Sequence, residues 1–189
     1  ELGIKIGNVT NDGLFGFFKT SCLGLSDQES SALINFHAFT NLTPIKVKKI
    51  VSKLRQGHSV ESLSNYPKDN IQYKPKDNKV VFFKAYQQGN ALKKLKDFKP
   101  NDVIDLVKQS KLSGRGGAFF PTGMKWQFCK ENESEQKYII CNADEGEPGT
   151  FKDRVLMNKY PGLLLEGMAM AGYAVRAKEG FIYLRAEYF

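Results

Sequence analysis

Apolar residues at helical spacing form the clearest pattern in the chain. After a start at Thr43-Pro44, four apolar positions follow at helical intervals before Gly57, namely Val47, Ile50, Val51 and Leu54. Further helices are predicted over residues 91–98, 101–111 and 161–175. In the helix at 101–111 we expect Asn101 to be the cap. Its apolar face would consist of Val103, Ile104, Leu106 and Val107.

Short apolar or aromatic runs between these helices predict strands. They cover residues 14–18, a hairpin made of 31–36 and 38–40, then 80–83, 137–141 and 181–184. The run at 137–141 is compact and apolar, and we expect it to be buried on both faces if it is a central parallel strand. Small residues in 161–175 favour close packing of that helix on the sheet. The alternation of strands and helices predicts an α/β fold.

A polar stretch at residues 57–79, which contains Pro67 and Pro75, divides the chain. We therefore predict one domain over residues 1–65, a linker over 66–79 and a second domain over 80–189. The chain begins Glu1-Leu2-Gly3 without a start Met, and it ends at Phe189 just after a strand. We therefore expect a fragment or a processed product.

Composition and charge restrict the function classes. With 41% hydrophobic and 25% charged residues, the chain has an ordinary globular composition. Its longest apolar stretch, 163–175, is too short to span a bilayer. The net charge of +8 is compatible with an anionic cofactor or with nucleic acid. No nucleic-acid-binding signature accompanies it, so we exclude nucleic acid and interpret the main lysine cluster as a solvated face. This cluster consists of Lys93, Lys94, Lys96 and Lys99.

The chain has three cysteines, Cys22, Cys129 and Cys141, and no Cys-x-x-Cys pair. An odd number of scattered cysteines argues against a disulfide framework. It favours a reducing compartment, and we predict a cytoplasmic protein.

Residues 112–126, LSGRGGAFFPTGMKW, contain four glycines within ten positions, Gly114, Gly116, Gly117 and Gly123. Glycine costs backbone entropy and packs nothing. Such density suits a backbone that approaches a ligand closely and turns its N–H groups toward an anion. The spacing fits neither the Walker pattern nor the Rossmann fingerprint. A mobile loop without a ligand is the alternative.

A helix is predicted directly after this loop, with Thr122 as its cap. Lys125 lies in its first turn, where a cation opposes the helix dipole at a cost of ~0.3–1 kcal/mol. A bound anion would remove the conflict, because the dipole, the lysine and the free N–H groups would all attract it. A solvated lysine is the alternative.

Residues 142–154, NADEGEPGTFKDR, follow the predicted strand 137–141. Ligands of open α/β sheets bind at the carboxyl ends of the strands. The carboxylates of Asp144, Glu145 and Glu147 can accept hydrogen bonds from ribose or ribityl hydroxyls, and Asn142 can address an amide-like ring edge. The spacing excludes an EF-hand, so we predict no metal here. A polar turn is the alternative.

Together, residues 113–128 and 138–154 closely resemble the FMN- and NADH-binding segments of the complex I flavin-subunit family. This family includes the diaphorase (alpha) subunit of NAD-reducing soluble hydrogenase and the flavin subunit of NAD-dependent formate dehydrogenase. The resemblance implies a Rossmann-like FMN/NAD(H)-binding domain over 80–189, truncated at its C-terminal side.

The N-terminal residues TSCLGLSDQESSALI are similar to the end of the thioredoxin-like [2Fe–2S] domain that precedes the flavin domain in the hydrogenase diaphorase. Cluster-bearing relatives have Cys-x-Gly-x-Cys, whereas here Cys22 and Gly24 are followed by Ser26. Because such clusters need four cysteine ligands and no further cysteine lies upstream, we expect a cluster-free, degenerate domain. The fusion of both parts in one chain favours the hydrogenase diaphorase.

The resemblance also implies roles for individual residues. Gly114, Arg115, Gly116, Gly117 and Lys125 would hold the FMN phosphate and ribityl chain. Asn142, Asp144 and Glu145 would contact the flavin, and Glu147 would contact the nicotinamide nucleotide between Phe120 and Phe128. Phe119 departs from the family, which usually has Gly there, so its effect on the loop is open.

The implied activity is hydride transfer between NAD(H) and FMN, with electrons passed to Fe–S clusters outside this chain. No protein general base is required, because the redox chemistry belongs to the cofactor. We expect [4Fe–4S] ligands only downstream, and partners among the Fe–S and hydrogenase subunits of a hetero-oligomer. The alternatives are a flavin subunit of complex I or of formate dehydrogenase, or a non-catalytic docking module.

Overall fold

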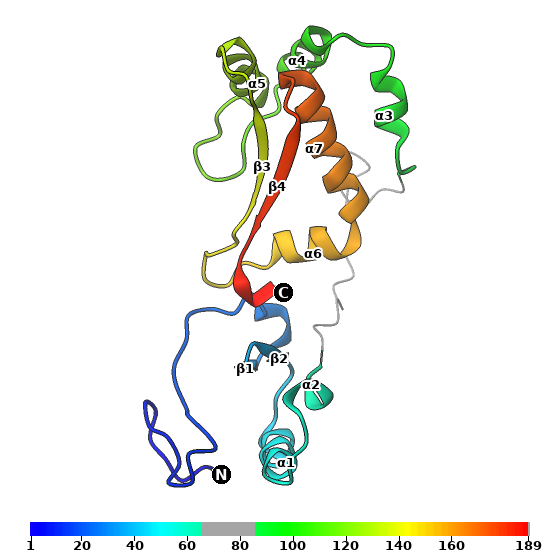
Figure 1. Ribbon diagram of the computed structural model, residues 1–189. Helices are drawn as coiled ribbons and strands as arrows, with labels where there is room; N and C mark the ends of the chain where they lie inside the picture. Colours follow the sequence, from blue (N-terminus) through cyan, green and yellow to red (C-terminus); the bar gives the residue numbers. More distant parts are fainter. Residues whose placement is uncertain (66–85, 189) are drawn as a thin grey trace. The chain divides into compact units, whose positions relative to one another are not determined.

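The computed structural model describes residues 1–65 and 86–188 (Figure 1). The chain divides into two compact units that interleave along the sequence. Unit 1 comprises Glu1–Gln72, Asp144–Val155 and Arg185–Phe189, and unit 2 comprises Tyr73–Ala143 and Leu156–Leu184. The predicted linker 66–79 and the predicted strand 80–83 lie outside the described residues, and the proposed domain boundaries stay a prediction.

Unit 1 contains a short hairpin, made of β1 (Ala32–Ile34) and β2 (His37–Phe39), which confirms the predicted one. Asn35 and Phe36 make its two-residue turn, with φ angles of 47° and 67°. Left-handed backbone at both positions matches the twist of an antiparallel pair. The predicted strand at 14–18 is wrong, because the chain there forms only an isolated bridge between Val9 and Gly16.

The helices of unit 1 are α1 (Pro44–Arg55) and α2 (Val60–Leu63), with a 3₁₀ turn, η1, at Ser26–Gln28. The hydroxyl of Thr43 accepts a hydrogen bond from the Lys46 N–H at 3.3 Å, and Pro44 occupies the first helical position. The predicted start of α1 is therefore confirmed, for the expected reason that this cap satisfies a free N–H and proline needs none there.

Unit 2 is built on two parallel strands, β3 (Tyr138–Ala143) and β4 (Glu179–Leu184), with Ile140 opposite Phe181. The long helix α7 (Pro161–Val175) packs on one face of this pair, as Figure 1 shows. Gly172 of α7 faces Ile139, and Met168 faces Gly180, so small residues allow the close approach. The predicted bounds of α7 and the parallel pairing are confirmed.

The other face of the pair is open within the described residues. Its side chains, Tyr138, Ile140, Phe181 and Tyr183, are 48%, 67%, 54% and 61% exposed. Burial of residues 137–141 on both faces was predicted for a central strand, and β3 is not a central strand in the part of the chain described. The reason is that β3 pairs here with β4 alone and is covered by α7 on one side only.

Three more helices surround α7, namely α3 (Asn90–Leu95), α4 (Pro100–Gln109) and α5 (Thr122–Glu131). Their core consists of Val103, Ile104 and Ala174, with Leu95 and Trp126 packed against it. Leu106, expected on the buried face of α4, is 47% exposed. A last helix, α6 (Lys152–Lys159), continues from unit 1 into unit 2.

Two predicted caps are wrong. The N-cap of α4 is Lys99 rather than Asn101, and its backbone N–H donates to the Asp102 carboxylate at 2.8 Å. The helix begins at Pro100, nearer the N-terminus than predicted, because the fixed φ of proline suits the first helical position. The N-cap of α5 is Pro121 rather than Thr122, which is the first helical residue and makes no side-chain cap.

Candidate functional site

The glycine-rich segment forms a loop between α4 and α5 whose two ends lie side by side. An antiparallel bridge joins Ser113 to Pro121. The Gly114 N–H donates to the Phe120 carbonyl, and the Thr122 N–H donates to the Leu112 carbonyl, both at 2.9 Å. Residues 114–120 are therefore presented as one exposed loop at the first turn of a helix.

The glycines of this loop fall into two groups. Gly117 has φ +108°, which other residues rarely adopt, and a Cβ on Gly123 would lie 2.7 Å from the Lys108 nitrogen of α4. The fold itself therefore requires these two glycines. Gly114 and Gly116 differ, because a Cβ would lie 3.7 Å from the Phe120 carbonyl oxygen at Gly114 and within 4 Å of nothing at Gly116. Neither position needs glycine for folding, so both leave open space beside the backbone that a ligand can fill.

Phe119 lies in the same loop with φ 51° and is 61% exposed. A bulky residue in left-handed backbone is a strained position. The resemblance placed glycine here, and the backbone angle gives the physical reason why glycine would suit it. The departure at Phe119 therefore leaves the loop's left-handed shape in place.

The two predicted nucleotide-flanking aromatics are neighbours. The rings of Phe120 and Phe128 lie 6.4 Å apart and are tilted by 50°, and the side chains are 45% and 54% exposed. An open cavity of about 370 Å³ extends beside Phe128 toward the start of β3. It is lined by Phe128, Cys129, Asn132, Ser134, Gln136, Lys137 and Tyr138. The sequence did not predict this cavity.

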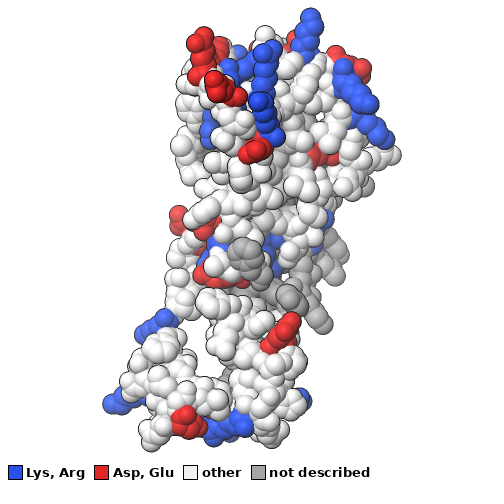
Figure 2. Space-filling model, viewed as in Figure 1, with Lys and Arg blue, Asp and Glu red and all other residues white. Residues whose placement is uncertain are grey.

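The predicted cationic residues Arg115 and Lys125 are both exposed. Lys125 lies in the first turn of α5, and its N–H donates to the Pro121 carbonyl at 3.1 Å. On the face that Figure 2 draws, positive and negative side chains are interspersed over α4 and α5. The lysines at 93, 94, 96 and 99 are exposed, as expected for a solvated face.

The acidic loop, which we define as Asp144–Thr150, lies in unit 1 and follows β3 directly. Asp144 and Glu147 are exposed, whereas Glu145 is 3% exposed. The Glu145 carboxylate accepts hydrogen bonds from the N–H groups of Asp153 and Arg154, at 2.9 and 3.3 Å. It therefore occupies the N-terminus of α6, a role that the sequence analysis did not foresee.

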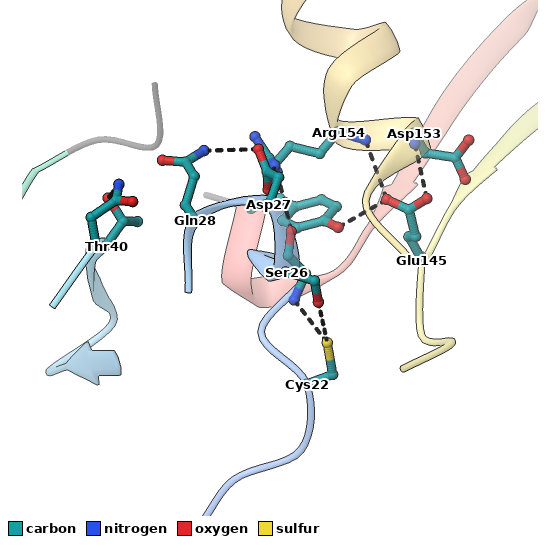
Figure 3. A network of polar contacts seen from close by, with 11 residues as sticks. Cys22, Ser26, Asp27, Gln28, Thr40, Glu145, Asp153 and Arg154 are labelled. Carbon is teal, nitrogen blue, oxygen red and sulfur yellow. Dashed lines mark hydrogen bonds and ion pairs between the residues drawn. The ribbon is translucent and has the colours of Figure 1, made fainter. Parts of the chain in front are cut away.

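Further donors reach Glu145 from the Tyr188 hydroxyl at 2.9 Å and from the Lys152 ammonium at 3.4 Å. Burial opposes ionisation of the carboxyl, but these donors outweigh it, and the pKa of Glu145 is lowered. Burial and the hydrogen bond to Glu145 raise the pKa of Tyr188. Figure 3 shows Glu145 beside Asp153 and Arg154.

The acidic loop is joined to the N-terminal segment Cys22–Asp27, a contact that sequence reasoning missed. The Cys22 sulfur accepts a hydrogen bond from the Gly149 N–H at 3.3 Å and one from the Gly24 N–H at 3.5 Å. The Ser26 hydroxyl lies 3.7 Å from the same sulfur. These contacts, the bond from Gly149 first, lower the pKa of the Cys22 thiol.

The predicted site residues thus fall into two sets. The glycine loop, Lys125, the two aromatics and Asn142 belong to unit 2, whereas Asp144, Glu145 and Glu147 belong to unit 1. Each set therefore lies within one unit. That the two sets face each other around one nucleotide stays a prediction.

Comparison with known proteins accounts for both parts of the chain. Residues 107–189 match the Nuo51 FMN-binding domain, and residues 1–55 match the thioredoxin-like [2Fe-2S] ferredoxin family. The two matches thus cover separate parts of the chain, a ferredoxin-like part and an FMN-binding part. The predicted α/β fold, a thioredoxin-like part followed by an FMN-binding part, is confirmed.

Among named relatives, the NAD-reducing hydrogenase HoxS subunit alpha of Cupriavidus necator is 45% identical over 100% of this chain and 33% of its own length. A subunit of the NADH-quinone oxidoreductase of Aquifex aeolicus is 52% identical over 52% of this chain and 23% of its own length. The chain thus spans about a third or less of these relatives.

Solved structures give the same result. The structure of an air-oxidized NAD+-reducing [NiFe]-hydrogenase matches 99% of this chain with a TM-score of 0.75 and 33% identity, over 33% of the matched chain. The H2-reduced form matches with the same TM-score and 35% identity, over 32% of that chain.

The ferredoxin match conflicts with the expectation of a cluster-free domain at Cys22. The donors around that sulfur do not fit a four-cysteine cluster, because its described neighbours are two N–H groups and a hydroxyl. Cys129 and Cys141 belong to unit 2.

None of the helices in the described part of the chain has the length and apolar character of a membrane span.

Proposed function

We propose that this chain is part of a flavin-binding NAD(H) oxidoreductase subunit, a diaphorase, that passes hydride between nicotinamide and FMN. The observation that carries the proposal is the open space at Gly114 and Gly116, in a loop of the matched FMN-binding domain. Relatives named as NAD-reducing hydrogenase and NADH-quinone oxidoreductase support the reaction class.

In this proposal the N–H groups of residues 114–117, together with Arg115 and Lys125, bind the FMN phosphate and ribityl chain. Asn142 and Asp144 contact the flavin. Phe120, Phe128 and Glu147 contact the nicotinamide nucleotide. Glu145 contributes through the loop that it fixes at α6, because both of its oxygens already accept hydrogen bonds from the protein.

Bound FMN would supply the hydride acceptor and the exit for single electrons. The protein's own residues bind the phosphate, orient the ring and exclude water, and none of them is required as a general base. We propose Fe–S and hydrogenase subunits as electron partners in a cytoplasmic hetero-oligomer, with [4Fe–4S] ligands outside these residues. The flavin subunits of complex I and of formate dehydrogenase remain the alternative assemblies.

A pair of alanine substitutions tests the cofactor site. Gly116→Ala adds a methyl group to open space, so the free energy of unfolding without FMN should change by less than ~0.5 kcal/mol. FMN affinity should fall about 10- to 100-fold, because the methyl would occupy the ligand's space. Flavin absorbance and its bleaching by NADH provide the measurement.

The matched control is Gly123→Ala, whose methyl group would collide with the α4 backbone at Lys108. This variant should lose stability before it loses FMN selectively. Unchanged FMN affinity in Gly116→Ala would contradict the proposed loop, and a wild-type protein that never retains FMN would contradict the function. A docking module without catalysis would show neither absorbance nor bleaching.

We also propose that the thioredoxin-like part carries no [2Fe–2S] cluster of its own. The motive is that Ser26 stands in the second cysteine position and that Cys22 is the one cysteine before residue 129. Iron analysis and electron paramagnetic resonance of a Cys22→Ala variant test this. Loss of a [2Fe–2S] signal on substitution would refute it.

A further inference from the structure

The acidic loop is fixed at both ends by a segment more than a hundred residues away in sequence. Arg185 donates from Nη1 to the Glu145 carbonyl and from Nη2 to the Cys22 carbonyl, each at 2.6 Å. The Cys22 sulfur accepts from the Gly149 N–H at the far end of the loop. Cys22 therefore reaches both ends of the loop, once directly and once through a buried guanidinium.

A buried ion pair reinforces this arrangement. The Arg154 guanidinium pairs with the Asp27 carboxylate, and its Nε donates to the Gly24 carbonyl at 3.2 Å. The two side chains are only 5% and 7% exposed. Removing the charge of one partner leaves the other charge buried without compensation. The ion pair therefore holds the segment Cys22–Asp27 and the start of α6 in one arrangement. Figure 3 shows Asp27 and Arg154 side by side.

The loop needs such support because it has little regular structure. Fixing one residue costs about 1–2 kcal/mol of backbone entropy. Contacts that order the loop before a ligand arrives remove this cost from binding, so they raise affinity without touching the ligand. Glu147 and Asp144, which are exposed on this loop, would benefit.

We propose that the segment Cys22–Asp27 is a positioning element for the acidic loop, and that it lowers the KM for NADH without taking part in the chemistry. The proposal rests on the proposed function of Glu147. It gives the ferredoxin-like part a task in ordering the acidic loop of its own unit. Asp27 is the positioning residue that tests it most directly, because its carboxylate contacts Arg154 rather than any predicted ligand residue.

The test is Asp27→Asn in the protein as the cell makes it, purified with its native partners. The amide keeps the shape but leaves the buried Arg154 charge unpaired. The KM for NADH should rise about 3- to 10-fold, with kcat changed less than twofold. Asp27→Glu, which keeps the charge, should restore part of the lost affinity. Hydrogen exchange of residues 144–150 should accelerate in Asp27→Asn.

Asn65→Ala is the matched control. In the same unit, Asn65 Nδ2 donates to the Thr40 hydroxyl at 2.6 Å, and the Thr40 N–H donates to Asn65 Oδ1 at 3.1 Å. This change removes part-buried polar contacts of the N-terminal part but none with the acidic loop. It should lower stability while leaving the KM and the loop exchange unchanged.

Two results would overturn the inference. One is an equal KM increase in Asp27→Asn and Asn65→Ala, which would show general destabilisation. The other is unchanged loop exchange in Asp27→Asn. If the wild-type protein fails to oxidise NADH, the proposed function is wrong, and loop exchange still decides whether Cys22–Asp27 orders the loop.

Discussion

Phe36 and Phe119 are both bulky residues in left-handed backbone, with φ angles of 67° and 51°. They are 85% and 61% exposed, so burial of the rings does little to offset the strain. Their functional settings differ, because Phe36 is at a hairpin turn of unit 1 and Phe119 is in the glycine loop of unit 2. Because the two residues share the backbone strain and differ in setting, Phe36 can serve as the control for substitutions at Phe119.

We predict that Phe36→Gly and Phe119→Gly each stabilise the fold by up to about 1 kcal/mol, since glycine relieves the strain but costs some backbone entropy. Only Phe119→Gly should change FMN or NADH affinity. Urea unfolding and flavin titration measure the two effects. Equal, unchanged affinities in both variants would mean that the Phe119 ring does not reach the nucleotide.

At the residue scale, the sequence identifies the charge and chemistry of a side chain better than its hydrogen-bond partners in the fold. Arg115 within the glycine loop and Lys125 just after it are both exposed, and their predicted contact with a phosphate stays a prediction. Glu145 lies at the start of α6 and accepts hydrogen bonds from groups as far along the chain as Tyr188. No local sequence pattern predicts such distant partners. Arg154 and Arg185 escaped notice for the same reason, because a buried charge looks like a solvated one in sequence.

At the scale of elements, Glu166 shows how one carboxylate joins two helices. It lies on α7, is 5% exposed, and accepts N–H bonds from Gly89, Ala91 and Leu92 at the start of α3. The distances are 3.0, 2.6 and 3.2 Å. Burial opposes its ionisation, but the three N–H donors outweigh it and lower the pKa of Glu166.

We predict that Glu166→Gln destabilises unit 2 by about 1–3 kcal/mol, because an amide cannot satisfy all three donors. Loss of α3 protection in hydrogen exchange should accompany the change. Glu61→Gln, on the exposed face of α2, is the control and should be neutral. A neutral result at Glu166 would show that water replaces the carboxylate there.

Elements with strong local signals were predictable. The start of α1 at Thr43-Pro44, the hairpin and the bounds of α7 follow from caps, turns and helical spacing. The open face of β3 was not predictable, since an apolar run gives no information on how many strands will cover it. The caps of α4 and α5 shifted by one or two residues, because Pro100 and Pro121 set the chain direction there.

On the scale of the whole molecule, the described parts of both units contain a buried carboxylate with a lowered pKa, Glu145 in unit 1 and Glu166 in unit 2. A lowered folded-state pKa contributes stability above the ordinary value of about 4.3. This contribution is lost as the pH falls toward the folded-state pKa. Both units should therefore lose stability in acid.

We predict that the urea midpoint stays nearly constant from pH 7 to about pH 5 and falls at lower pH, and that the double variant Glu145→Gln, Glu166→Gln shows a flatter profile in this acid range. Urea unfolding followed by tryptophan fluorescence measures unit 2 through Trp126, the single tryptophan. An equally steep acid dependence in the double variant would assign it to other groups.

The helix starts of this protein differ in the charge of the side chains that lie beside them. Negative side chains of its own chain already sit at the beginnings of α3, α4 and α6, in the form of Glu166, Asp102 and Glu145. A phosphate approaching any of these three would be repelled. At α5 the first turn carries the positive Lys125 instead. Of these four helix starts, that of α5 carries no carboxylate, and under the proposed function this difference favours binding of the nucleotide's phosphate there.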